Sequence, residues 1–152
     1  MLFFVSVYLW LNLLLVRWDI RCGLLPDRLT CPLLWLGLLW HCTSRTMLLP
    51  EAVLGAIAGY VSFAAIYWGF RWLYGYEGLG YGDVKYLSAL GAWHGWESLP
   101  ALVCIAATLA CGLVLLRGIV LRSLQTIKNP LPFGPCLAAA GLLVGIHTLL
   151  QT

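Results

Sequence analysis

Charged side chains are scarce in this sequence of 152 residues, which holds nine Lys and Arg and six Asp and Glu. Together they make up 10% of the chain, whereas 62% of the residues are apolar and the mean hydropathy is +0.90. An average soluble domain carries about 25% charged residues, so the composition excludes an ordinary soluble protein. The sequence therefore predicts a protein whose principal solvent is the lipid bilayer.

Strict alternation of polar and apolar residues is also missing, which argues against a membrane β-barrel. The apolar residues form continuous runs instead, and several of these approach the roughly 17 to 25 residues that cross a bilayer as a helix. Six candidate helices result: 2–18, 30–44, 51–72, 83–96, 98–117 and 132–150. No repeat or linker divides the chain. We therefore expect an all-α polytopic membrane protein, a single transmembrane domain spanning 1–152 with about six transmembrane helices.

No basic residue precedes the first apolar run, whereas Arg17 and Arg21 follow it, which reverses the charge order of a cleavable signal peptide. Because short cytoplasmic loops accumulate Lys and Arg, the N-terminus and, after six helices, the C-terminus are expected outside the cytoplasm. Eight of the nine cations then face the cytoplasm, namely Arg17, Arg21, Arg28, Arg71, Lys85, Arg117, Arg122 and Lys128, and only Arg45 lies outside. The net charge of +3 follows from this topology and indicates no nucleic-acid partner.

Several catalytic and metal-binding signatures are absent. The six cysteines form no CxxC pair, and no GxSxG, HExxH or Walker sequence occurs. The three histidines, His41, His94 and His147, map near the outer ends of the expected helices, across the membrane from most of the acidic residues. We expect no metal site and no cofactor, and an Asp–His or Cys–His site on the cytoplasmic side would lack its imidazole.

Acidic residues gather on one side of the expected membrane. Asp19, Asp27, Glu77 and Asp83 fall on the cytoplasmic side, and carboxylates at membrane depth usually mark a functional site. Simpler roles stay open at this point, because Asp83 could cap the start of a helix and Asp19 could form a surface ion pair with Arg17 or Arg21.

A pair of facing aspartates suits peptide hydrolysis by an activated water. Like charges at close range do not both ionise easily, so one carboxyl keeps a proton while the other acts as a base. The glycines that precede Asp83 at alternate positions, Gly78, Gly80 and Gly82, allow close approach of another backbone, such as an extended substrate segment.

Three stretches resemble conserved motifs of one known family. The run Gly80-Tyr81-Gly82-Asp83-Val84-Lys85 is similar to the GxGD signature of type IV prepilin peptidases, which are intramembrane aspartyl proteases. The stretch from Asp19 to Leu25-Pro26-Asp27-Arg28-Leu29-Thr30 resembles the other aspartate motif of that family, and Pro132-Phe133-Gly134-Pro135 resembles the conserved stretch before its last helix. The similarity covers nearly the whole chain.

The resemblance implies roles for individual residues. Asp19 and Asp83 would be the catalytic aspartates. Asp27 is the alternative acid, although capping the next helix is its simpler role. The remaining candidates would contact substrate or shape the loop, and they are Gly80, Gly82, Lys85 and Glu77.

The resemblance also implies substrates and a location. The family cleaves membrane-inserted prepilins or pseudopilins of type IV pilus and type II secretion systems, at the cytoplasmic face of the bacterial inner membrane. Long members carry a preceding region with paired CxxC motifs linked to N-methylation, which has no counterpart in this sequence. We therefore expect a peptidase without methyltransferase activity, or one that depends on another protein for that step. A small membrane transporter or a silent assembly partner of a pilus or secretion system is the alternative.

Overall fold

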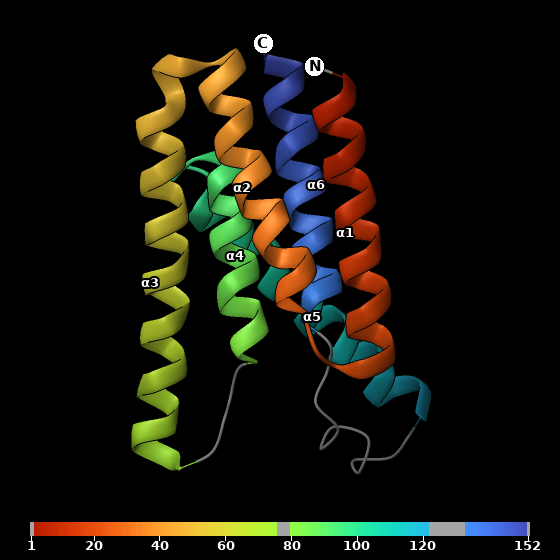
Figure 1. The fold of residues 1–152 in the computed structure, drawn as a ribbon. Helices are drawn as coiled ribbons and strands as arrows, with labels where there is room; N and C mark the ends of the chain where they lie inside the picture. Colours follow the sequence, from red (N-terminus) through yellow and green to blue (C-terminus); the bar gives the residue numbers. More distant parts are fainter. Residues whose placement is uncertain (1, 76–79, 122–132, 152) are drawn as a thin grey trace.

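The computed structural model describes residues 2–75, 80–121 and 133–151 (Figure 1). Over these ranges the chain forms six α-helices and one short 3₁₀ helix, and it contains no strand. The elements are α1 (Leu2–Cys22), α2 (Asp27–Ser44), η1 (Thr46–Leu48), α3 (Leu49–Tyr74), α4 (Tyr81–His94), α5 (Leu99–Leu121) and α6 (Gly134–Gln151). The prediction of an all-α fold with six helices is confirmed.

Three stretches within these helices are long and apolar enough to cross a bilayer: Phe3–Cys22, Thr46–Tyr74 and Leu99–Arg117. A shorter apolar stretch, Gly134–Thr148, lies in α6. The chain is therefore a membrane protein, while the number of crossings stays a prediction.

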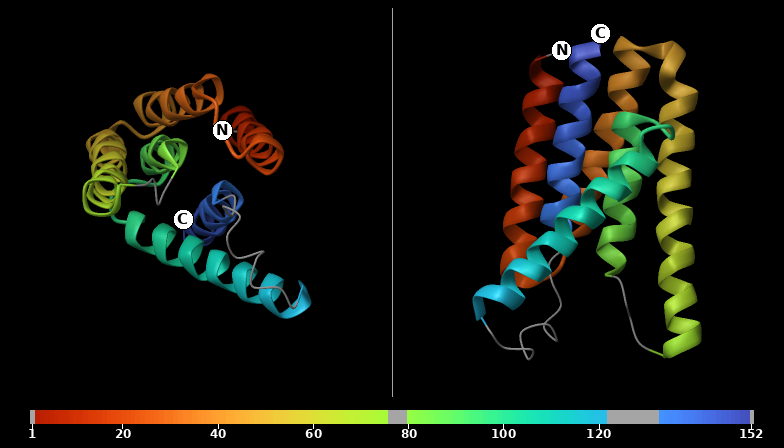
Figure 2. Two further views of the ribbon diagram at one scale, coloured as in Figure 1. Left: turned by 90° about the horizontal axis from the view of Figure 1, so that it is seen from below. Right: turned by 180° about the vertical axis from the view of Figure 1, so that it is seen from behind.

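The short helix α4 lies inside the bundle. Viewed along the bundle in Figure 2, α1, α2 and α3 form an arc around one side of α4 and α6, and α5 crosses obliquely on the other side. Nine of the 14 residues of α4 are buried: Asp83, Val84, Tyr86, Leu87, Ser88, Ala89, Leu90, Gly91 and Ala92. Because its neighbours enclose it, α4 needs no lipid-facing surface of bilayer length.

Glycines allow α3 and α4 to pack closely. A Cβ added to Gly55 would strike the backbone oxygen of Gly91, and a Cβ added to Gly91 would strike that of Gly55. A Cβ on Gly59 would lie 2.8 Å from the backbone oxygen of Leu87. Small residues at these positions let two helix backbones approach as they do in many membrane proteins. This packing fixes α4 in place.

The two ends of the bundle differ in the side chains they carry. The chain termini lie together at one end (Figures 1 and 2). Near this end α2, α4 and α6 carry His41, His94 and His147 in or close to their last turns, and we call it the histidine end. At the opposite end α1 finishes and α4 begins, which brings in Asp19 and Asp83. We call this the aspartate end.

Candidate functional site

Asp19 lies in the last turn of α1 and is only 5% exposed. Its Oδ2 accepts a hydrogen bond of 2.9 Å from the backbone N–H of Gly134, the first residue of α6. The N-terminus of a helix favours negative charge, so α6 supports an ionised Asp19. Neither Arg17 nor Arg21 forms an ion pair with it among the described residues, and the simple surface-pair explanation is therefore wrong.

Asp83 is the third residue of α4 and is 7% exposed. The residue at the N-cap position is Gly80, and no side chain caps this helix, so the capping explanation for Asp83 is wrong. The charge of Asp19 acts electrostatically on the Asp83 carboxyl. The end of α1 and the start of α4 thus bring two buried carboxyls into one site.

Two further buried side chains border this pair. They are the phenol of Tyr86 on α4 and the thiol of Cys136 on α6. Both aspartates act electrostatically on each of these two groups. Both side chains are almost completely buried. The carboxyls therefore lie where α1, α4 and α6 meet, with protein on several sides.

The two glycines of the predicted loop motif meet different neighbours. A Cβ on Gly80 would lie 3.3 Å from Oδ2 of Asp83, and a Cβ on Gly82 would lie 2.8 Å from Cβ of Leu25 in the connection between α1 and α2. Gly82 therefore lets the start of α4 approach that connection closely. A direct role of either glycine in substrate binding stays a prediction.

Asp27 and Lys85 form an ion pair at the surface of the aspartate end. Lys85 Nζ donates to both carboxylate oxygens of Asp27, at 2.7 and 2.8 Å, and the Asp27 side chain is exposed. Asp27 is the first residue of α2, but no side chain caps that helix, so its predicted capping role is wrong. The ion pair joins the start of α2 to the start of α4. The remaining loop candidate, Glu77, lies outside the described residues.

The sequence-based predictions did not include a buried series of hydrogen bonds that links α1 and α4. Tyr86 donates its O–H to Oδ1 of Asn12, and Asn12 Nδ2 donates to the backbone oxygen of Tyr8 at 2.7 Å. The signal was available, because Asn12 is an amide in an otherwise apolar run, and polar groups at membrane depth need partners. The N–H donated by Gly134 was not predictable, since a backbone group leaves no mark of its own on the sequence.

This arrangement supports carboxylate chemistry. Two carboxyls that share a buried site can divide the tasks of acid and base, because the first ionisation opposes the second. Among the described residues, no group of three or more His, Cys, Asp or Glu is arranged to hold a metal ion.

Comparison with known proteins gives consistent matches. The type IV leader peptidase family matches residues 6–116. Leader peptidase HopD of Escherichia coli is 56% identical over 147 residues, which cover 97% of this chain and 94% of that protein. Leader peptidase HopD of Salmonella typhimurium is 58% identical over 142 residues, covering 93% and 91%. No solved structure matches the chain.

A longer relative matches over part of its length. The prepilin leader peptidase/N-methyltransferase of Pectobacterium carotovorum is 50% identical over 125 residues, which cover 82% of this chain but 44% of that protein. The resemblance predicted from the aspartate motifs is therefore confirmed. The enzyme class is confirmed with it, and these matches favour a peptidase over a membrane transporter. The chain belongs to the type IV leader peptidase family, and it is a peptidase of the prepilin peptidase type.

Proposed function

We propose that this peptidase is an intramembrane aspartyl endopeptidase that removes the short N-terminal leader of prepilins or pseudopilins, with Asp19 and Asp83 as its catalytic pair. One observation carries the proposal: two carboxyls, 5% and 7% exposed, are buried at the same end of the bundle, where α1 ends and α4 and α6 begin. A buried, uncompensated carboxyl is costly, and chemistry that requires it gives a reason to retain it. The names of the similar proteins, which are leader peptidases, supply the substrate class.

The mechanism divides the work between the two carboxyls. One of them, ionised, takes a proton from a water molecule as the water attacks the carbonyl carbon of the scissile bond. The other, protonated, donates a hydrogen bond to the carbonyl oxygen. The proton then passes to the leaving amine and the carbon–nitrogen bond breaks. The Gly134 N–H favours an ionised Asp19, so we assign the base to Asp19 and the acid to Asp83.

The distribution of cations supports a cytoplasmic site in the inner membrane. Arg17, Arg21 and Arg28 lie in or beside the end of α1 and the start of α2, and Lys85 lies at the start of α4, all at the aspartate end. Arg45 lies at the histidine end, between α2 and η1. By the positive-inside rule the aspartate end faces the cytoplasm. We propose six crossings, with both chain termini on the opposite side.

We further propose that residues 1–152 act as one transmembrane peptidase domain that performs cleavage without methylation. These residues contain no CxxC pair. They match less than half of the Pectobacterium protein whose name combines both activities. Any N-methylation of the product then requires a region outside these residues.

The test compares three carboxylates at the aspartate end. The enzyme and a membrane-inserted prepilin are combined, and leader removal is followed as the mass change of the substrate. We expect Asp19→Asn and Asp83→Asn each to lower the cleavage rate by on the order of 10³-fold or more, because each removes one member of an acid–base pair. Asp27→Asn is the matched control, since it makes the same chemical change in an exposed carboxylate of the same region.

The outcomes separate the candidates clearly. Thermal unfolding of each variant shows whether the fold is intact. Normal cleavage by folded Asp83→Asn or Asp19→Asn would overturn the catalytic pair. Loss of cleavage in Asp27→Asn alone would identify Asp27 as the catalytic carboxylate.

A further inference from the structure

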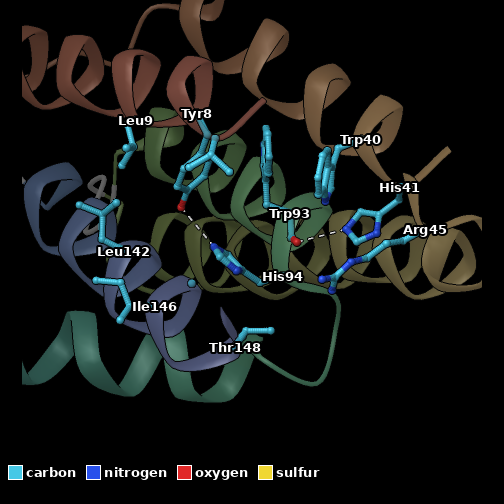
Figure 3. Close-up of a pocket in the computed structure, with 12 residues that line it drawn as sticks. Tyr8, Leu9, Trp40, His41, Arg45, Trp93, His94, Leu142, Ile146 and Thr148 are labelled. Atoms are coloured by element: carbon cyan, nitrogen blue, oxygen red, sulfur yellow. Dashed lines mark hydrogen bonds between the residues drawn. The ribbon is translucent and has the colours of Figure 1, made fainter. Parts of the chain in front are cut away.

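An apolar cavity lies at the histidine end, far from the two carboxyls. Its volume is about 320 Å³, and residues of α1, α2, α4 and α6 line it together with Arg45 (Figure 3). On α1 the lining residue Tyr8 precedes Asp19 by eleven positions, which corresponds to about 16 Å along the helix axis. The cavity is therefore separate from the proposed active site and needs its own explanation.

Hydrogen bonds hold the wall of this cavity in shape. The Tyr8 hydroxyl and Nε2 of His94 are 3.1 Å apart, and Nε2 of His41 donates to the backbone oxygen of Trp93 at 3.2 Å (Figure 3). Trp93 in turn donates its indole N–H to the backbone oxygen of Leu33 at 2.8 Å. Small-molecule sites are usually preformed in this way and occupy roughly 300 to 1,000 Å³. The cavity is at the lower end of that range.

One side of the cavity is apolar and reaches the surface. Leu9 on α1 and Ile146 on α6 both line it and are both exposed, and Leu142 lies between them in Figure 3. This side of the cavity therefore borders an apolar surface of α1 and α6, helices that we place in the bilayer. An apolar chain can enter here directly from the membrane.

The other side of the cavity is cationic. Arg45 lines it beside His41, and no described carboxylate forms an ion pair with Arg45. Glu51 acts electrostatically on His41, but it is exposed and does not line the cavity. An anion would complement this side.

We propose that the cavity binds one acyl chain of an anionic phospholipid, with the lipid phosphate held by Arg45. An apolar body next to a single unpaired cation fits a ligand that has both a hydrocarbon chain and a negative charge. The volume accommodates part of one chain and excludes a transmembrane helix of a protein substrate. The proposal does not depend on which residues cleave the leader.

The test measures lipid binding to the purified full chain in a neutral detergent by native mass spectrometry. The probes are phosphatidylglycerol, phosphatidylcholine with the same acyl chains, and glycerol phosphate as the head group alone. We expect phosphatidylglycerol to bind on the order of tenfold more tightly than phosphatidylcholine, because the choline cation of phosphatidylcholine offsets its phosphate charge and is repelled by Arg45; this factor is the size of one charge-assisted contact. Glycerol phosphate should not be retained, because it lacks the acyl chain. Equal binding of the two lipids, or retention of glycerol phosphate, would overturn the proposal.

Paired variants separate the cavity from the general surface. Arg45→Gln should abolish the preference for phosphatidylglycerol, whereas Arg21→Gln, which removes the same charge at the aspartate end, should preserve it. Leu142→Trp should fill the cavity and block binding, whereas Leu143→Trp changes a neighbouring exposed residue that does not line it. Val5→Phe fills the cavity from α1 if Leu142→Trp does not fold. Equal effects within either matched pair would show that no specific site exists.

Discussion

Both ends of the helix bundle bury polar side chains, but they satisfy them differently. At the histidine end, the hydroxyl of Tyr8 and the rings of His41 and His94 take part in hydrogen bonds. At the aspartate end, Asp19 accepts one hydrogen bond from Gly134, and no described group donates to Asp83. A buried carboxyl with so few partners lowers stability. The comparison indicates that the histidine end maintains its shape, whereas the aspartate end keeps charge available for chemistry.

The strictest test of the aspartate end displaces the carboxyl of Asp19, the proposed base, without removing it. A Cβ on Gly134 would lie 2.6 Å from Oδ2 of Asp19, so Gly134→Ala must move that carboxyl. The helical backbone of α6 tolerates alanine, and therefore the fold should survive. Because a displacement near 1 Å can cost about 10²-fold in rate, we expect kcat to fall by about that factor, measured as the rate of leader removal.

Gly112→Ala is the matched control for this variant. Gly112 lies within α5, and a Cβ added there meets nothing within 4 Å. Alanine is favoured over glycine in a helix by up to about 1 kcal/mol, so this variant should be as stable as the parent or slightly more stable, with unchanged activity. An unchanged kcat in Gly134→Ala would show that the position of Asp19 does not limit the reaction.

The contact between α3 and α4 allows packing to be disturbed without touching the carboxyls. Gly55→Ala or Gly91→Ala places a methyl group against the backbone oxygen of the facing helix, and neither backbone can yield cheaply. Overpacking of this kind costs about 1 to 3 kcal/mol, so we expect a lower Tm in thermal unfolding. Gly69→Ala in the same helix α3 is the control, because its Cβ would meet nothing within 4 Å. Equal melting of Gly55→Ala and Gly69→Ala would contradict the close packing.

The sequence predicted the helices well because lipid imposes a simple rule on composition. The expected range 51–72 became α3 at Leu49–Tyr74, and 83–96 became α4 at Tyr81–His94. The sequence also predicted that Asp19 and Asp83 lie at one end of the bundle, because both residues adjoin helix ends. It did not predict partners across the fold, such as Lys85 for Asp27. A capping role depends on local sequence, whereas this ion pair depends on how α2 and α4 are packed.

The buried hydrogen bond between Tyr86 and Asn12 lies between the two ends of the bundle. Tyr86→Phe removes the donor and leaves the Asn12 carbonyl buried without it. An unsatisfied buried acceptor costs about 1 to 3 kcal/mol, so we expect that loss in the free energy of unfolding. Adding Asn12→Leu to Tyr86→Phe removes both partners and should recover part of it. A double-mutant cycle measures the coupling, and additive effects of the two changes would contradict the bond.

The smallest effect is expected at the surface of the aspartate end, where Lys85 pairs with the exposed Asp27. Exposed ion pairs contribute about 0 to 1 kcal/mol and weaken as salt screens them. Lys85→Gln should therefore lower the free energy of unfolding by at most about 1 kcal/mol, and less in high salt, while cleavage remains close to normal. Asp27→Asn should behave in the same way, because it breaks the same pair. If Lys85→Gln instead raised KM strongly while Asp27→Asn did not, Lys85 would contact the substrate, and the chemistry of the aspartate end would extend beyond its buried carboxyls to this surface.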